Sequence, residues 1–456
     1  MSSNGTSVIL PPLPGLLLHP VFDVRPEVMS LGFSVRQEQG NKIVSKQLHI
    51  VSDAQRVKPF RASEEQFVAG KPLHYQEGGT LPDLDAQWPR EDFVAFMADP
   101  RCPNSGDLYR DLMSKVRAHV ELDHEGKYVI LACWVALTYL YPLFPAVPFL
   151  HIVGSKGTGK TQLLEVLEQL TRNAHRAAIT RALTGDMMEY YRPTLLTDQV
   201  DHLSPDLIDT LAASYRHGSR RSVTNTDDRT KPLIFGTFGP KALAGTEELP
   251  VDLRDRAIVL TTVPARVILA PVQPEDSECA HIRGRCYAWA LFNFWKLPPL
   301  LDTMRHTSGS ALCREVWPGL ASYQGRQHEL WLPIEVIMEA LEVPEADREQ
   351  ARDYYQRSQT STRAELPEGD ARLLQFLLGK VGQNPTAEVN SKELLSNLNG
   401  TDDLGFSWND KQLGIGLKRL GLLRGESKRV QKNSMRLYVI DGDAVRSLGS
   451  RYRLTE

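Results

Sequence analysis

A glycine-rich segment in the middle of the chain carries the residue types needed to hold a nucleotide. Residues 149–170 read "FLHIVGSKGTGKTQLLEVLEQL", and the stretch from Gly154 to Thr161 matches the pattern GxxxxGK[ST]. Glycines let backbone N–H groups curl around phosphate oxygens, and the N-terminus of a following helix adds partial positive charge. The segment therefore predicts a phosphate-binding loop (P-loop) for ATP.

Each position of this loop has an expected role. Lys160 is expected to contact the β- and γ-phosphates, and the Thr161 hydroxyl to bind Mg²⁺. An apolar strand precedes the loop and a helix with an apolar stripe follows it, which disfavours the alternative of a chance glycine-rich turn. The predicted nucleotide-binding residues are Gly154, Ser155, Lys156, Gly157, Thr158, Gly159, Lys160, Thr161 and Gln162.

A second carboxylate is expected at the end of the apolar stretch "TLLTDQVD", residues 194–201. Asp198 ends this strand and is predicted to bind Mg²⁺, directly or through water. Gln199 stands where an ATPase needs a Glu to activate the attacking water. An amide can orient that water but cannot accept its proton, so we expect tight ATP binding and slow hydrolysis. For Asp201 we favour a helix cap or a solvated position.

A basic segment follows, "YRHGSRRSVTNTDDRTKPLIFGTFGPKALAG", residues 215–245. Two strands around the turn-forming "NTDD" predict a hairpin. Its basic residues, predicted to contact DNA unless the loop is simply solvated, are Arg220, Arg221, Arg229 and Lys231. Thr237, at the end of the second strand, is a candidate for positioning the attacking water.

Two arginines precede the next apolar strand in "LPVDLRDRAIVL". An exposed arginine here, Arg254 or Arg256, is suited to reach the γ-phosphate held by a neighbouring subunit, where it accelerates hydrolysis by about 10³-fold or more. A local salt bridge to Asp252 or Asp255 is the alternative.

The elements that must position these residues indicate an α/β protein. From about 145 to 265, short apolar strands alternate with helical segments, which is typical of a parallel sheet. Residues 1–90 are expected to be small and mostly β, 91–125 to be helical, 275–345 to be helical, 346–368 to be a linker, and 369–456 to form a separate domain.

Composition narrows the class of protein. The chain has 456 residues and a net charge of −3, so the protein as a whole is not a basic nucleic-acid binder. Five cysteines without CxxC spacing argue against disulfides or a zinc site and favour a cytoplasmic location. The uncharged stretch 128–153 contains Pro142, Pro145 and Pro148. It therefore predicts a buried helix, a turn and a strand rather than a membrane span.

The C-terminal segment has a different charge balance. From Lys411 to Glu456 there are eleven Lys and Arg against four Asp and Glu, a net charge of +7. Three expected helices followed by a hairpin indicate a winged helix, which either contacts DNA or packs against protein. The basic residues of the expected wing, suited to phosphate contacts, are Lys428, Arg429, Lys432 and Arg436.

Residues 126–340 resemble the ATPase core of a family of phage, plasmid and mobile-element proteins, known mainly as a domain of unknown function. That family belongs to the AAA+ class and is distantly related to MCM and superfamily-3 helicases. The segments that carry the resemblance are "WVALTYLYPLFPAVPFLHIVGSKGTGKT", "PTLLTDQVD", "FGTFGPKALAG", "LPVDLRDRAIVL" and "GRQHELWLPIEVIMEALE".

The resemblance implies an AAA+ core at 91–270, a helical lid at 271–345, and a hexameric ring with ATP at each subunit interface. It implies that Arg256 is the arginine finger and that Arg326 is a second sensor acting within its own subunit. The family usually has Asp-Glu where this chain has Asp198-Gln199. Similar tails occur in the family, which supports the winged-helix fold more than DNA as its ligand.

These observations leave three hypotheses. The first is an ATP-driven ring that translocates on or unwinds DNA during replication of a phage or mobile element. The second is an ATP-dependent switch in anti-phage defence or protein assembly, in which nucleotide binding matters more than turnover. The third is a DNA-binding loader or scaffold with almost no hydrolysis.

Overall fold

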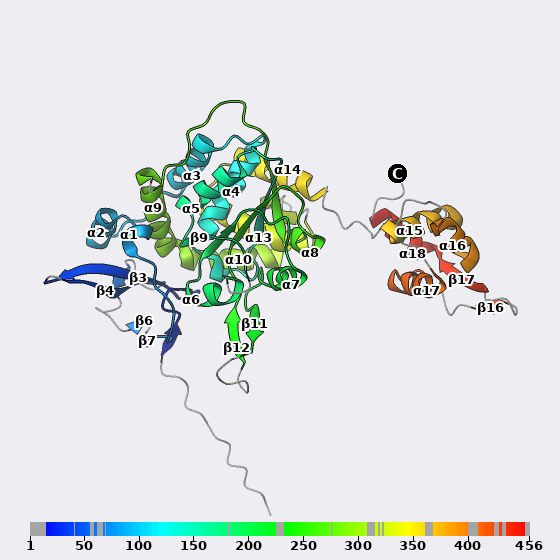
Figure 1. Cartoon of the computed structure of the whole chain (residues 1–456), viewed down its shortest axis with the longest axis horizontal. Coiled ribbons are helices and arrows are strands. Elements are labelled where there is room, and N and C mark those ends of the chain that lie inside the picture. Colours follow the sequence, from blue (N-terminus) through cyan, green and yellow to red (C-terminus); the bar gives the residue numbers. More distant parts are fainter. Residues whose placement is uncertain are drawn as a thin grey trace, which may run out of the picture. The chain divides into compact units, whose positions relative to one another are not determined.

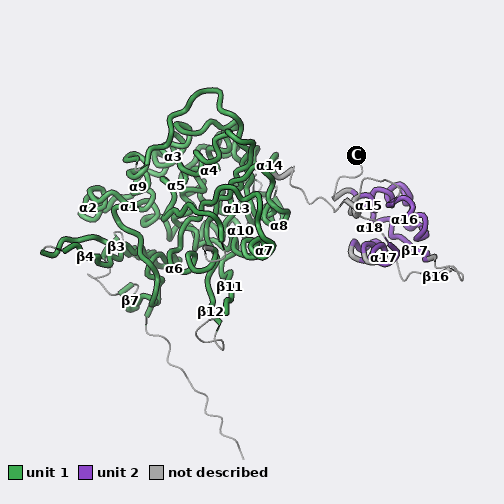
Figure 2. Tube along the Cα trace, in the orientation of Figure 1, with its two compact units in different colours: residues 1–358 green, residues 359–456 purple. Residues whose placement is uncertain are grey.

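The computed structural model forms two compact units, residues 1–358 and 359–456, shown in different colours in Figure 2. The described residues are 15–40, 42–54, 59–61, 67–68, 70–180, 183–224, 232–274, 276–307, 315–317, 320–321, 323–360, 368–399, 409–423, 428–430 and 435–451.

A five-stranded parallel sheet lies at the centre of the first unit, in the order β14-β8-β13-β10-β9 (Figure 1). The strands are β8 (Phe149–Val153), β9 (Ala174–Arg176), β10 (Thr194–Thr197), β13 (Lys241–Gly245) and β14 (Ala257–Thr261). Because all five strands run the same way, their carboxyl ends meet at one edge. The segments that follow β8, β10 and β13 therefore meet there.

Both faces of this sheet are buried, which is why its strands read as apolar runs. Leu150 and Ile152 point into the larger hydrophobic core, whereas Phe149 points into a smaller one on the other face. Helices contributing to the larger core include α3 (Ser105–His119), α4 (Glu125–Leu137), α5 (Lys160–Leu170) and α9 (Ser277–Asn293). Helices α7 (Pro205–Ala213) and α8 (Val251–Arg254) contribute to the smaller core.

The uncharged stretch before the P-loop forms the buried helix and strand that the prolines predicted. Helix α4 is fully buried from Val129 to Leu137, and a 3₁₀ turn, η1 (Tyr141–Leu143), leads towards β8. Within the described residues, no helix combines the length and apolar character that crossing a membrane requires.

The N-terminal region packs on the same large core. Phe22, Phe33 and Trp88 all belong to it. Its strands form an antiparallel sheet of β2 (Phe22–Val24), β3 (Val28–Gln39), β4 (Lys42–Asp53) and β5 (Phe60–Arg61), and a second sheet of β1 (Leu16–Leu18), β7 (Lys71–Tyr75) and β6 (Phe67–Val68). Helices α1 (Leu84–Gln87) and α2 (Arg90–Ala98) follow.

The predicted hairpin is present between β10 and β13. Strands β11 (Arg220–Val223) and β12 (Leu233–Gly236) pair antiparallel and project from the core (Figure 1). The remaining helical elements of this unit are η2 (Leu183–Met187), α6 (Met188–Tyr190), η3 (Phe294–Lys296), α10 (Leu297–Thr307), α13 (Gly325–Ala340) and α14 (Glu345–Thr360).

The second unit has its own hydrophobic core, which includes Leu373, Leu394, Leu413 and Ile440. Its elements in chain order are α15 (Glu368–Val381), β15 (Thr386–Asn390), α16 (Ser391–Asn399), α17 (Asp410–Arg419), β16 (Lys428–Val430), β17 (Met435–Asp441) and α18 (Gly442–Arg451). Strands β15 and β16 both pair antiparallel with β17.

Candidate nucleotide-binding site

The P-loop lies at the carboxyl edge of the sheet, between β8 and α5. Gly157 and Gly159 adopt left-handed backbone conformations, with φ of 81° and 83°, which glycine adopts without steric cost. Helix α5 begins at Lys160, and no side chain caps its first turn. The unpaired N–H groups of a helix N-terminus favour an anion, so this loop fits a bound phosphate.

The side chains of Lys160 and Thr161 both make hydrogen bonds at this edge of the sheet. The Lys160 Nζ donates to the carbonyl oxygens of Gly154 and Ser155, each at 2.7 Å. The Thr161 hydroxyl donates to Asp198 Oδ2 at 2.8 Å, which joins the P-loop to the end of β10. A hydroxyl beside a carboxylate fits Mg²⁺, which takes oxygen ligands and relies on few protein groups.

Gln199 follows Asp198 with an unusual backbone conformation. Its φ is 58°, in the left-handed region that non-glycine residues seldom occupy, and its backbone N–H donates to Asp198 Oδ1 at 2.9 Å. The side chain is exposed. The amide is therefore presented to solvent beside the predicted Mg²⁺ carboxylate.

Asp201 does not cap a helix but joins two loops of the carboxyl edge. It accepts hydrogen bonds from the Thr246 backbone N–H at 2.7 Å, the Thr246 hydroxyl at 3.1 Å and the Glu247 N–H at 2.9 Å. Partial desolvation acts to raise the Asp201 pKa, but these hydrogen bonds outweigh it and hold the pKa below its usual range. Thr246 was not predicted from the sequence. The apolar stretch "KALAG", which forms β13, directly precedes it and could have indicated a residue at the carboxyl edge.

Thr237 requires a correction, because the structure does not bring it to the P-loop. The sheet strand starts only at Lys241, after the Gly239-Pro240 turn, so Thr237 lies near the amino edge. Thr237 is buried, and its hydroxyl is 2.9 Å from the Ser219 Oγ at the base of the hairpin. The residue that follows β13 at the carboxyl edge is Thr246.

Arg256 and Arg326 both lie at the amino edge, opposite their own P-loop. Arg256 precedes β14, and its carbonyl accepts the Phe149 N–H at the start of β8. The guanidinium carbons of the two arginines lie 5.5 and 4.8 Å from the ring centroid of Tyr215. Arg326 also pairs with Asp255 at 3.4 Å. Arg326 thus lies away from the P-loop of its own subunit, a position that does not favour the predicted role of a sensor acting there, and that role stays a prediction.

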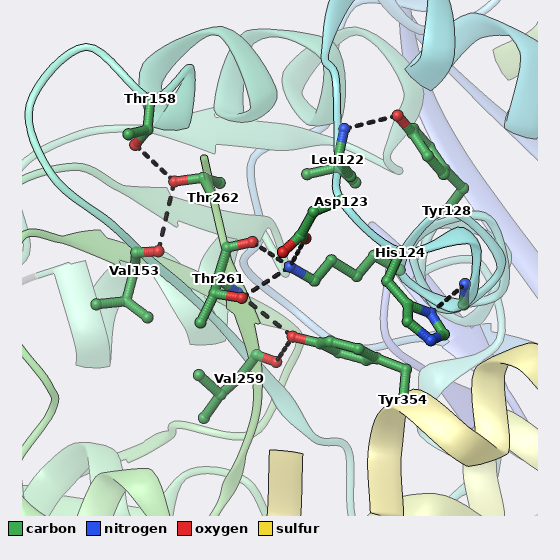
Figure 3. Close-up of polar contacts among 12 residues, drawn as sticks. Leu122, Asp123, His124, Tyr128, Val153, Thr158, Val259, Thr261, Thr262 and Tyr354 are labelled. Atoms are coloured by element: carbon green, nitrogen blue, oxygen red, sulfur yellow. Dashed lines mark hydrogen bonds and ion pairs between the residues drawn. The ribbon is translucent and has the colours of Figure 1, made fainter. Parts of the chain in front are cut away.

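Hydrogen bonds fix the P-loop to β14 and to more distant helices (Figure 3). The Thr158 and Thr262 hydroxyls are 2.7 Å apart, and the Thr262 N–H donates to the Val153 carbonyl. The adjacent Thr261 hydroxyl accepts from the Lys127 Nζ of α4 at 2.7 Å.

Helix α14 joins the same cluster through Tyr354 (Figure 3). Its hydroxyl donates to the Val259 carbonyl at 2.9 Å, and the Lys127 Nζ lies 5.0 Å from its ring centroid. Burial lowers the Lys127 pKa, and the neighbouring Asp123 carboxylate opposes that shift only in part. The P-loop, β14, α4 and α14 thus form one connected polar cluster.

The basic residues predicted to contact DNA are only partly described. Arg220 is exposed and has no partner within the described residues, whereas Arg221 lies 3.8 Å from Asp206. In the second unit, Lys428 and Arg429 lie on β16, and Arg436 is exposed on β17. Arg229, Lys231 and Lys432 lie outside the described residues.

His151, on the strand that leads into the P-loop, is expected to make the free energy of unfolding depend on pH. Burial lowers its pKa from 6.5 to about 4, and the nearby Glu247 backbone and Glu248 carboxylate oppose this only in part. The unfolded chain therefore takes up a proton that the folded chain excludes. This contribution to stability is complete above pH 6.5 and is lost as the pH falls towards 4, by up to ~3 kcal/mol.

We expect His151→Leu to flatten the acid slope of the unfolding free energy, measured by urea titration between pH 7.5 and 4.5. Part of the slope should remain, because burial also lowers the pKa of His19 to about 3. Identical slopes in the parent and the variant would contradict this assignment.

Comparison with known proteins gives fold-level likenesses only. No family model and no curated protein sequence matches the chain. A solved structure described as SCCmec type IV Cch, an active helicase, is similar at 10% identity with a TM-score of 0.38, covering 96% of this chain and 99% of that one.

Two further solved structures are similar at the same level. The NrS-1 C-terminal region has 12% identity and a TM-score of 0.37, covering 86% of this chain and 94% of its own. A full-length MCM homolog from Methanopyrus kandleri has 12% identity and a TM-score of 0.34, covering 72% of this chain and 76% of its own. Likenesses this distant assign no function to this chain. The parallel sheet and its loop are consistent with a P-loop NTPase core.

Proposed function

We propose that this chain is an AAA+ ATPase that assembles into a ring and uses ATP to move along or unwind DNA during replication of a phage or mobile element. The observation that carries the proposal is the hydrogen bond between Thr161 and Asp198 at the P-loop edge. It joins the two groups that a nucleotide-bound Mg²⁺ requires. Bound ATP would supply the phosphoanhydride bond that is cleaved, and Mg²⁺ held by Thr161 and Asp198 would supply positive charge beside the phosphates.

In this proposal each residue of the carboxyl edge has a defined task. Lys160 exchanges its two carbonyl partners for phosphate oxygens and balances their charge, while Thr161 and Asp198 hold Mg²⁺. Gln199 orients a water without taking its proton, so binding is tight and turnover slow. Thr246, held by Asp201, presents its hydroxyl at the same edge. We propose that Thr246, and not Thr237, positions the attacking water.

The position of the arginines supports assembly into a ring. Arg256 lies at the amino edge, so it reaches a γ-phosphate only in a second copy of the chain. Its Nη1 donates to the Asp252 carbonyl, while its Nε is buried without a hydrogen-bond partner in the described residues, so the guanidinium is only partly satisfied within its own subunit. We propose that Arg256 and Arg326 act together on the neighbouring subunit, and that helices α9, α10 and α13 form the lid.

DNA contact is proposed at two places. The hairpin β11–β12 presents Arg220 without a competing partner in the described residues. In the second unit, three helices and the β16–β17 hairpin follow the winged-helix order, with β15 added, and Arg436 is exposed. Both sites suit phosphate contacts, which position a protein on DNA without reading sequence.

A strand-displacement assay tests the proposal. Forked DNA is incubated with ATP and either the chain as it stands or Gln199→Glu. We expect the Glu variant to unwind the fork with DNA-stimulated hydrolysis and the parent to bind DNA without unwinding it. Hydrolysis by the Glu variant that DNA does not stimulate, together with no unwinding, would reject the motor function.

The second candidate is an ATP-dependent switch in defence or protein assembly, and the presence of Gln199 itself favours it. In that case the chain should change its assembly state on binding ATP, and Gln199→Glu should shorten the lifetime of the assembled form. Size measurements with ATP before and after the substitution distinguish the switch from the motor.

A further inference from the structure

A polar groove runs between the N-terminal region and the base of the β11–β12 hairpin. It consists of hollows of about 560 Å³ and 250 Å³ that share Gln76, Pro142, Arg192 and His217 as lining residues. The larger hollow is bounded by residues 23–27, and the smaller one reaches Arg220 on β11. Strand β7 and the hairpin project from the same side of the core (Figure 1).

Most carboxylates of this groove are already occupied by protein donors. Glu189 accepts from the Gly236 backbone N–H at 2.5 Å. Asp23 accepts from the His19 N–H at 2.9 Å and from the Arg25 guanidinium at 3.2 Å. Glu27 is the exception within the described residues, and it lines only the larger hollow, away from the hairpin.

The cationic side chains retain free donors. Arg192 donates through Nη1 to the Phe22 carbonyl at 2.6 Å, and its other guanidinium nitrogens have no partner in the part of the chain that is described. Arg220 likewise has none there. The His217 ring packs against Phe238, with centroids 5.3 Å apart. The smaller hollow therefore combines guanidinium groups that keep free donors within the described residues with an aromatic wall.

We propose that this groove binds the backbone of single-stranded DNA and guides it from the hairpin towards the N-terminal region. The inference rests on the proposed function and adds Arg192, His217 and Gln76 to its DNA path. Guanidinium groups hold phosphates with directed hydrogen bonds, and aromatic side chains accept bases of any sequence. Only a single strand leaves its bases free to stack on such a wall, because the bases of a duplex are stacked on one another.

Gln76→Glu tests this path without removing a structural contact. The Gln76 side chain is exposed and makes no hydrogen bond with the described residues, while its backbone N–H donates to the Leu18 carbonyl. The substitution keeps the shape of the side chain and places a negative charge between the two hollows. Gln47→Glu is the matched control, because it makes the same change on an exposed part of β4 outside the groove.

The measurement is fluorescence anisotropy of a labelled poly-dT oligonucleotide with full-length protein and ATP, over a range of salt concentrations. We expect Gln76→Glu to weaken binding about fivefold at low salt and Gln47→Glu to leave it unchanged. Arg192→Gln should lower the slope of log K against log salt by about 0.7, the value for one phosphate contact on a single strand.

The outcomes separate this inference from the proposed function. If Arg220→Gln weakens binding while Gln76→Glu and Arg192→Gln bind like the parent, the groove is not part of the path, and the motor function stands. If the parent binds no single-stranded DNA with ATP present, both proposals fail. If the groove variants lose affinity for duplex DNA alone, the assignment to a single strand is overturned.

Discussion

Gln199→Glu is expected to raise the rate of ATP hydrolysis by about 10²- to 10³-fold while leaving ATP affinity within about twofold. A correctly placed general base contributes about 10²–10⁴-fold, and the amide of Gln199 supplies only the orientation of the water. The substitution changes one terminal atom of an exposed side chain and leaves its backbone N–H bond to Asp198 untouched. Steady-state phosphate release and binding of a fluorescent ATP analogue measure the two effects.

Gln199→Ala provides the control for this result. It removes the amide without supplying a carboxylate, so its hydrolysis should be no faster than that of the parent. A rate for Gln199→Glu equal to that of Gln199→Ala would show that another group activates the water, or that the edge holds no attacking water at all.

The carboxyl edge of the sheet was largely predictable, because its residues belong to local motifs. A strand, a glycine loop and a helix occur in succession around Lys160, and a short apolar strand ends at Asp198. Parallel pairing then brings such strand ends to one edge. No long-range information was needed to expect the contact between Thr161 and Asp198.

The positions of Thr237 and Arg326 were not predictable, because local patterns do not specify where a residue lies relative to the sheet. The sequence "FGTFGPKALAG" contains two apolar runs, and only pairing with β8 and β10 shows that the second one enters the sheet. Thr237 therefore belongs to the hairpin base. Arg326 depends on how α13 packs, and a tertiary contact with Tyr215 places it at the amino edge.

The opposite positions of the P-loop and Arg256 lead to a test by mixing subunits. In the Gln199→Glu background, Lys160→Ala should abolish hydrolysis by removing the charge that binds phosphate, and Arg256→Ala should slow it by about 10³-fold. A mixture of the two should regain activity, because some interfaces join an intact P-loop to an intact arginine. Random assembly at equal amounts gives about a quarter of the parental rate, as expected for a head-to-tail interface.

Arg254→Ala is the matched control for the mixing experiment. Arg254 lies two residues before Arg256 but is bonded to Glu248, so its loss should leave most of the activity. Arg326→Ala extends the test, because the structure places it beside Arg256 over Tyr215. It should recover activity when mixed with Lys160→Ala but not when mixed with Arg256→Ala. Recovery with Arg256→Ala would mean that the two arginines serve different sites, and no recovery in any mixture would show that hydrolysis is completed within one subunit.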